Sequence, residues 1–84
     1  MPPPIEVQTP AELARVAQAR QHAASGTGRL IRKQAGLSLG EVARVLDCSP
    51  STVLRWERCE DAPSGHRAVR YAELLERLLG GRDG

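Results

Sequence analysis

The 84-residue chain is poor in aromatic residues and in cysteine, and it has no long hydrophobic run. It contains no phenylalanine, one tryptophan, one tyrosine and only two cysteines. Aliphatic side chains must therefore fill the core, which suits short helices packed in one small domain. No apolar run approaches the ~20 residues that cross a bilayer. The opening MPPPIEVQTP lacks the basic and apolar regions of a signal peptide, so we expect a cytoplasmic location.

The sequence also shows no recognisable catalytic or metal-binding pattern. Cys48, Cys59 and His66 do not have zinc-ligand spacing, since neither a CxxC nor an HxxxH motif occurs. We expect Cys48 to be a small buried side chain and Cys59 a partly exposed thiol, with no disulfide in a reducing compartment. There is no glycine-rich phosphate loop and no Ser/His/Asp arrangement. We therefore predict a protein that is not an enzyme and has no cofactor or metal.

Positive charge is concentrated in the middle of the chain. The net charge of the whole sequence is only +2, but residues 27–58 carry six basic side chains against three acidic ones. The flanking residues 1–26 are neutral and residues 59–84 are slightly acidic. Charge alone is equally compatible with a solvated surface, but a local excess of Lys and Arg is what phosphate binding requires.

The segment SLGEVARVLDCSPSTVLRWER, from Ser38 to Arg58, has the apolar spacing of two short helices joined by a tight turn. Its apolar residues are Leu39, Val42, Ala43, Leu46, Cys48, Val53 and Trp56. The first four recur with the i, i+3, i+4, i+7 spacing of a helix, and the pattern restarts after Ser49. Ala43 is small where the helices must cross closely. This pattern predicts a helix-turn-helix, whose second helix enters the DNA major groove.

Two helix-start signals support this interpretation. Ser38 and Glu41 form the S-x-x-E capping box, which satisfies free N–H groups at a helix start. Ser49 followed by Pro50 is a second start, a cap followed by a proline whose missing N–H has no cost there. An ordinary helical hairpin would show the apolar spacing without both caps.

The stretch GRLIRKQAGLSLGEVARVLDCSPSTVLRWERCEDAPSG resembles the lambda-repressor-like (Xre/Cro) helix-turn-helix DNA-binding family. The likeness runs from about Thr27 to Leu79. Gly28–Ala35 resembles the family's first helix, Ser38–Leu46 its second, and Pro50–Arg58 its recognition helix. The implied fold is all-α, a small lambda-repressor-like bundle of about five helices with an extra N-terminal helix. The DNA-binding domain would occupy residues 10–80, between a flexible segment 1–9 and a tail 81–84.

Four positions depart from the family pattern. Asp47 and Cys59 stand where the family usually has glycine in the turn and at the end of the recognition helix. Leu39 and Gly40 stand where a glutamine often contacts backbone or base. Asp tolerates left-handed backbone better than most residues, so the fold is expected to survive. The glutamine-based reading of bases cannot be carried over.

The resemblance and the inward placement of Val53 and Trp56 assign the opposite face of the recognition helix to DNA. The candidate base contacts are Ser49, Pro50, Ser51, Leu54, Arg55 and Arg58. The candidate phosphate contacts are Arg29, Arg32, Lys33, Ser38, Arg44 and Thr52. Arg55 can donate two hydrogen bonds to guanine O6 and N7. We expect a sequence-specific transcriptional regulator of a prokaryote or phage, most simply a repressor that blocks polymerase.

An additional helix is expected before the family-like region. The letters TPAE give a cap, a proline and an N3 glutamate, which predict a helix from Pro10 to about His22. Leu13, Val16 and Ala17 would share its apolar face. The alternating Ile5–Val7 is a weak strand signal.

A last helix is expected over Ser64–Leu79, ended by two glycines. Its apolar stripe is wider than one buried face requires. The residues expected to pack on the core are Val69, Ala72, Leu75 and Leu79. The residues left for a homodimer interface are Tyr71, Leu74 and Leu78. One alternative is that all of these side chains belong to the core of the domain itself. Another is that the helix 10–22 or the segment Ile5–Val7 pairs the subunits instead.

Two other function classes remain open. One is an antitoxin-like module that binds DNA and also binds a toxin partner through residues 10–22. The other is an excisionase-like architectural DNA binder, which the run STVLRWE also resembles. The helix preceding the motif argues against the second class.

Overall fold

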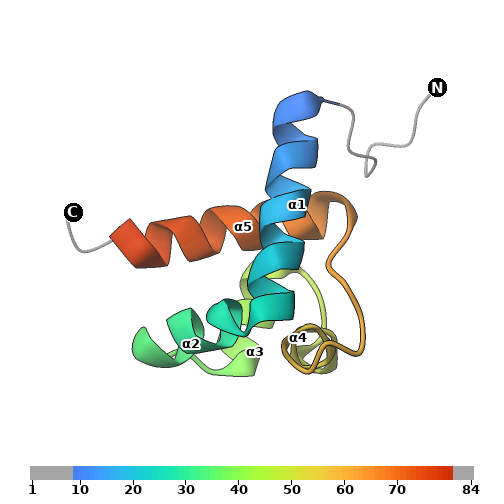
Figure 1. The fold of residues 1–84 in the computed structure, drawn as a ribbon. Coiled ribbons are helices and arrows are strands. Elements are labelled where there is room, and N and C mark those ends of the chain that lie inside the picture. The colour runs from blue at the N-terminus through green and yellow to red at the C-terminus, as the bar shows by residue number, and fades with distance from the viewer. Residues whose placement is uncertain (1–8, 81–84) are drawn as a thin grey trace.

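The computed structural model describes residues 9–80, which form five helices and no strand (Figure 1). The helices are α1 (Pro10–Ser25), α2 (Thr27–Gln34), α3 (Leu39–Leu46), α4 (Pro50–Glu57) and α5 (Gly65–Gly80). The expected all-α bundle with an extra N-terminal helix is confirmed. The expectations for the Ile5–Val7 strand, for residues 1–8 of the flexible segment and for the tail fall outside the described residues, and Thr9 is the N-cap of α1.

Helix α1 begins as its sequence signals predict but ends later. Thr9 Oγ1 accepts a hydrogen bond from the Glu12 amide at 3.1 Å, and the Glu12 carboxylate accepts one from the Thr9 amide at 3.2 Å. The helix continues past His22 to Ser25, because the first residue with left-handed backbone is Gly26, at φ 85°. α2 starts directly afterwards.

The core lies where α1 crosses α5, with α2, α3 and α4 packed below them in the view of Figure 1. The buried apolar residues are Val16, Ala19, Ala23, Ile31, Val42, Ala43, Leu46, Val53, Trp56, Ala68, Tyr71, Ala72 and Leu75. The rings of Trp56 and Tyr71 lie with their centroids 5.1 Å apart and anchor an otherwise aliphatic core. None of the helices within residues 9–80 is long and apolar enough to span a membrane.

The placement of two side chains on α5 was predicted wrongly. Tyr71 is 1% exposed and belongs to the core, so its expected position in a dimer interface is not possible. Leu79, expected in the core, is 59% exposed. The buried stripe runs through Ala68, Tyr71 and Leu75, and Leu79 lies a turn further on, near the free end of α5 (Figure 1).

The apolar face of α1 also differs from the expectation. Val16 is buried as expected, but Leu13 is 62% exposed and Ala17 is exposed. The other buried residues of α1 are Ala19 and Ala23, whose small side chains let this helix approach α5 closely. The first half of α1 projects beyond the other helices (Figure 1).

Candidate nucleic-acid interface

The helix-turn-helix is formed by α3, α4 and the turn at Asp47 and Cys48. Ser38 and Glu41 make the expected capping box at the start of α3, with hydrogen bonds of 2.9 and 3.0 Å. Hydrogen bonding of the Glu41 carboxylate with the backbone and side chain of Ser38 lowers the pKa of this carboxyl. At the turn, the Cys48 amide donates to the Ala43 carbonyl at 3.0 Å, which closes the end of α3.

The two positions where family glycines are replaced both keep a glycine-like backbone. Asp47 has φ 57° and Cys59 has φ 61°, and they are the non-glycine residues of the described range with positive φ. The sequence expectation for Asp47 is therefore met in the backbone itself. Such conformations cost an L-residue roughly 1–2 kcal/mol, so neighbouring contacts must hold both positions.

Helix α4 starts at the cap predicted for it. The Ser49 hydroxyl accepts a hydrogen bond from the Thr52 amide at 3.3 Å, and Pro50 follows as the first helical residue. Val53 and Trp56 are buried on the inner side of the helix. The inner face fixes the rotation of α4 about its axis, and therefore which residues point outward.

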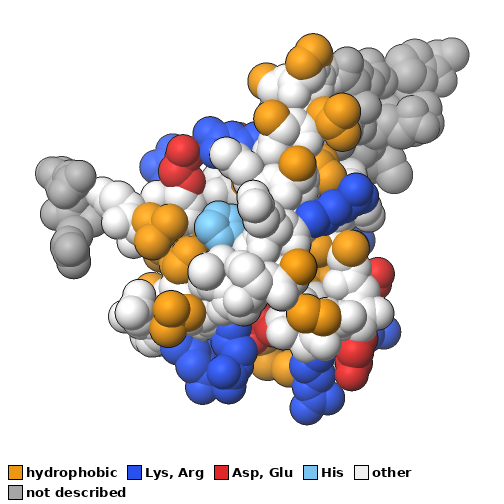
Figure 2. Space-filling view, in the orientation of Figure 1, with side chains coloured by type: hydrophobic (Ala, Val, Ile, Leu, Met, Phe, Trp, Pro, Cys, Tyr) orange, Lys and Arg blue, Asp and Glu red, His pale blue; other side chains and the backbone are white. Residues whose placement is uncertain are grey.

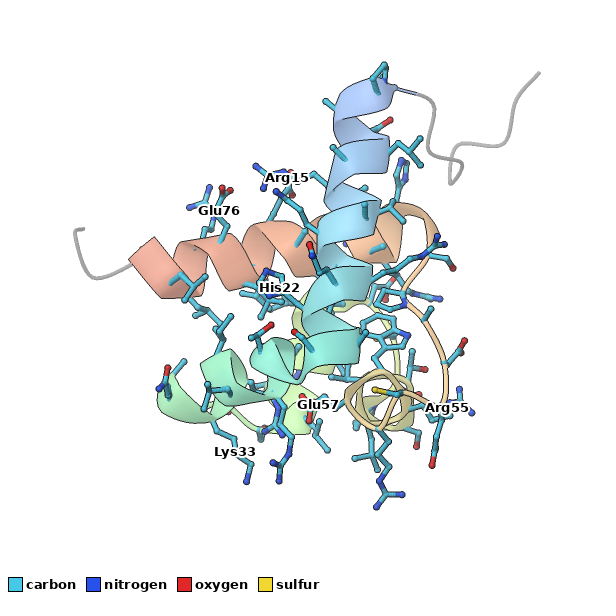
Figure 3. The ribbon with its side chains drawn as sticks, viewed as in Figure 1. Arg15, His22, Lys33, Arg55, Glu57 and Glu76 are labelled. Atoms are coloured by element: carbon cyan, nitrogen blue, oxygen red, sulfur yellow. The ribbon has the colours of Figure 1, made fainter. Side chains whose placement is uncertain are left out.

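The expected base-contact residues lie on the outer side of α4. The exposed ones are Ser49, Pro50, Ser51, Arg55 and Arg58, and Leu54 is half-buried at the edge of the face. Figure 3 shows Arg55 reaching away from the molecule, whereas Glu57 faces inward toward α2. The side chains assigned to base contact thus form one accessible surface, although their contact with DNA remains a prediction.

Five of the six expected phosphate contacts are accessible. Arg29, Lys33, Ser38 and Arg44 are exposed, and Thr52 is half-buried. Arg32 is different, because its side chain is 11% exposed and is already bonded within the protein. The structure therefore gives Arg32 a structural role in place of the expected phosphate contact.

The partners of Arg32 are Glu57 on α4 and the chain at Leu37. Its Nε and Nη2 atoms donate to the two carboxylate oxygens of Glu57 at 2.6 and 2.9 Å, and its Nη1 atom donates to the Leu37 carbonyl at 2.9 Å. The hydrogen bond with Glu57 raises the pKa of Arg32 further. The Glu57 side chain is only 2% exposed. This bidentate ion pair holds α2 and α4 in a fixed relative orientation.

The pairing of Arg32 with Glu57 leaves the surface of the motif positive. The exposed basic residues between positions 27 and 58 are Arg29, Lys33, Arg44, Arg55 and Arg58. The exposed acidic residues of the same segment are Glu41 and Asp47. Figure 2 shows Lys and Arg side chains gathered along the lower edge of the molecule, beneath α2 and α4. This edge has the charge that a phosphate backbone would attract.

The two thiols lie at either end of α4 and are both free. Cys48 is half-buried and packs against the core, and burial raises the pKa of its thiol. Cys59 is exposed, with its Sγ atom 3.6 Å from the Ala23 carbonyl at the end of α1. Within residues 9–80 no group of His, Cys, Asp and Glu side chains could hold a metal ion.

Sequence reasoning missed two contacts that hold the motif. One is the Arg32–Glu57 pair, and the other joins Arg67 of α5 to the carbonyl oxygen of Asp47. Both link residues that are 20 or more positions apart. Local spacing carries no signal for such pairs.

Comparison with known proteins agrees with this geometry. A family model described as helix-turn-helix matches residues 29–79, which include α3, the turn, α4 and nearly all of α5. Neither the curated proteins nor the solved structures gave a match. The matched segment covers more than half of the chain and contains every described candidate DNA contact. The chain therefore belongs to the lambda-repressor-like (Xre) helix-turn-helix family of DNA-binding regulators.

Proposed function

We propose that the protein is a small transcriptional repressor that binds a specific double-stranded DNA sequence through α4. The observation that carries the proposal is the outer face of α4, where Arg55 and Arg58 are exposed on a helix whose inner face is fixed by Val53 and Trp56. A helix of this width fits the major groove, where base edges differ in their hydrogen-bonding pattern.

In the proposed complex, different side chains have different tasks. Arg55 donates two hydrogen bonds to a guanine, and Leu54 contacts a thymine methyl group at the edge of the same face. Arg29 and Lys33 on α2, with Arg44 on α3, bind phosphates on either side of the groove. These contacts place the helix in register without reading sequence. Bound over a promoter, the domain would block polymerase.

We further propose that two copies bind together. One recognition helix reads only a few base pairs, whereas a two-fold pair reads two half-sites one helical turn apart, ~34 Å. With Tyr71 assigned to the core, the surface for pairing is the flank of α5 at Leu74 and Leu78, which are half-buried. A dimer would cover the part of each leucine that the domain leaves open.

The function is tested by selection from random duplex DNA followed by sequencing. The proposal predicts that one motif is enriched, with two related half-sites whose centres are about 10 base pairs apart. The full chain should then bind this duplex at least 1,000-fold more tightly than a scrambled duplex at physiological salt. Recovery of random sequences with equal affinity would contradict sequence-specific repression.

DNA bending, repression of a reporter and co-purification separate the other two classes. An architectural, excisionase-like binder would bend its duplex strongly and would fail to repress a reporter placed behind the selected site. An antitoxin-like protein would repress that reporter and would also co-purify with a partner held through residues 10–22. α1 buries Val16, Ala19 and Ala23 within the domain, so a partner could reach only its outer face.

A further inference from the structure

The turn of the helix-turn-helix is held from outside the motif. The carbonyl oxygen of Asp47 accepts two hydrogen bonds from the guanidinium of Arg67, from Nε at 3.1 Å and from Nη2 at 2.9 Å. Arg67 lies in the first turn of α5, 20 residues after Asp47 in the chain. Because two donors of a rigid, planar group meet one oxygen, the contact fixes the direction of that carbonyl as well as its position.

Arg67 bonds to a residue whose backbone conformation is unfavourable. Asp47 has φ 57° and ψ 48°, a left-handed conformation that residues with a β-carbon disfavour. The amides of Asp47 and Cys48 are bonded back to α3, at the Arg44 and Ala43 carbonyls. These bonds anchor the turn on the α3 side only. The Asp47 carbonyl points the other way, and its orientation sets the course of the chain into α4.

The positive charge of Arg67 also affects the pKa of a side chain in the turn. Burial raises the pKa of the Cys48 thiol, and the nearby positive charge of Arg67 opposes that rise. The neighbouring Arg70 lies beside the same hollow as Arg67 but makes no hydrogen bond or ion pair within residues 9–80. Arg70 is therefore a matched control, with the same charge on the same helix and without the contact.

We propose that Arg67 is a positioning residue for the recognition helix. By holding the Asp47 carbonyl, it keeps the turn left-handed and so fixes the angle at which α4 leaves α3. The consequence for DNA reading rests on the proposed function, but the effect on the turn does not. Arg67 acts through the backbone of the turn and need not touch DNA.

The turn is tested first in the free protein, by amide hydrogen exchange of Cys48 measured against the amides of α1. Arg67→Ala should speed exchange of the Cys48 amide by about tenfold, the scale of losing a charge-assisted hydrogen bond. Arg70→Ala should leave it unchanged. Equal exchange rates in the two variants would overturn the proposal, whatever the protein binds.

DNA binding then separates positioning from direct phosphate contact. Arg67→Ala should weaken binding to the selected duplex by about tenfold and leave binding to a random duplex and the salt dependence unchanged. A phosphate contact would instead weaken binding to both duplexes and lower the salt slope by about one unit, which would contradict the proposal. A chain that binds no duplex at all would reject the proposed function and leave the exchange result to decide the role of Arg67.

Glycine at the turn provides a rescue. Glycine adopts left-handed backbone without a steric penalty, so Asp47→Gly should make the turn less dependent on the hydrogen bonds from Arg67. In the Asp47→Gly background, adding Arg67→Ala should therefore cause a clearly smaller loss of specific affinity than it does in the original sequence. The same loss in both backgrounds would show that Arg67 acts elsewhere.

Discussion

The hydroxyl of Tyr71 is buried and has no hydrogen-bond partner within the described residues. It faces Gly28, where an added β-carbon would lie 2.5 Å from the hydroxyl oxygen. A buried polar group without a partner is a penalty of about 1–3 kcal/mol. Tyr71→Phe should therefore keep the ring contact with Trp56 and raise the free energy of unfolding by about 1 kcal/mol. Urea unfolding at neutral pH measures this change, and a loss of stability would point to an unseen partner for the hydroxyl.

Because this hydroxyl is buried, we expect the free energy of unfolding to depend on pH in the alkaline range. Burial raises the pKa of Tyr71 from 10.0 to about 12, with a smaller contribution from the charge of Glu57. Between about pH 10 and 12 the folded protein keeps this proton while the unfolded chain loses it. Stability from this group is therefore complete below pH 10 and falls as the pH rises to about 12. Unfolding measured at several alkaline pH values should show a shallower decline in Tyr71→Phe, and parallel curves would refute the assignment.

At the scale of elements, the junction between α2 and α4 depends on one ion pair. Removing Arg32 leaves the Glu57 carboxylate buried at 2% exposure with no counter-charge, which costs roughly 3–5 kcal/mol. Arg32→Ala should therefore unfold at much lower urea concentration. The double change Arg32→Leu with Glu57→Leu should recover most of the loss, because no unpaired charge remains. Additive losses in the double variant would show that the two side chains are not coupled.

On helix α1, a buried and an exposed side chain should contribute very differently to stability. Val16 is buried against α5, so Val16→Ala should lower the free energy of unfolding by about 2 kcal/mol. Leu13 is largely exposed on the projecting half of the same helix, and Leu13→Ala should change stability by less than about 0.5 kcal/mol. Thermal unfolding of the two variants checks the contrast. A larger effect at Leu13 would mean that the projecting half of α1 is covered in solution.

The helices were predictable where their signals are local. Caps at Ser38 and Ser49 and the spacing of apolar residues placed α3 and α4 to within a residue. The face that a helix buries was less predictable, because it depends on how helices cross. The apolar stripe of α5 is wide enough for two choices, and the prediction put Tyr71 outside and Leu79 inside. In the structure Tyr71 is buried beside Trp56 and Gly28, and Leu79 is exposed.

In the candidate site, too, features set by local sequence were predictable and features set by helix packing were not. The outward face of α4 followed from Val53 and Trp56 alone, because a helix has one inside once its buried residues are known. The role of Arg32 did not follow, since a basic residue in a positive segment has the same pattern whether it meets a phosphate or a buried carboxylate. Only the fold brings Glu57 Oε2 of α4 to 2.6 Å from Arg32 Nε of α2.

For the whole molecule, the proposed dimer predicts a change of mass. Leu74→Glu with Leu78→Glu should give a folded monomer with much weaker operator binding, because charges would then occupy the pairing surface. Sedimentation with and without the selected duplex measures this. Circular dichroism provides the control for folding, since an unfolded double variant would place both leucines in the core of the domain itself. A monomer of the unmodified chain, free and on DNA, would contradict pairing.

In the proposed complex α4 reads the base sequence and α2 supplies positive charge, and a pair of variants, one at an arginine and one at a lysine, tests this division most directly. Arg55→Ala and Lys33→Ala each remove one exposed positive charge. Binding of both variants to the selected duplex and to its single-base variants is measured across a range of salt concentrations. Arg55→Ala should cost ~1–3 kcal/mol and abolish discrimination at one base pair, whereas Lys33→Ala should weaken every duplex alike and lower the salt slope by about one unit. If Arg55→Ala leaves sequence preference unchanged, α4 does not read the DNA in the proposed orientation.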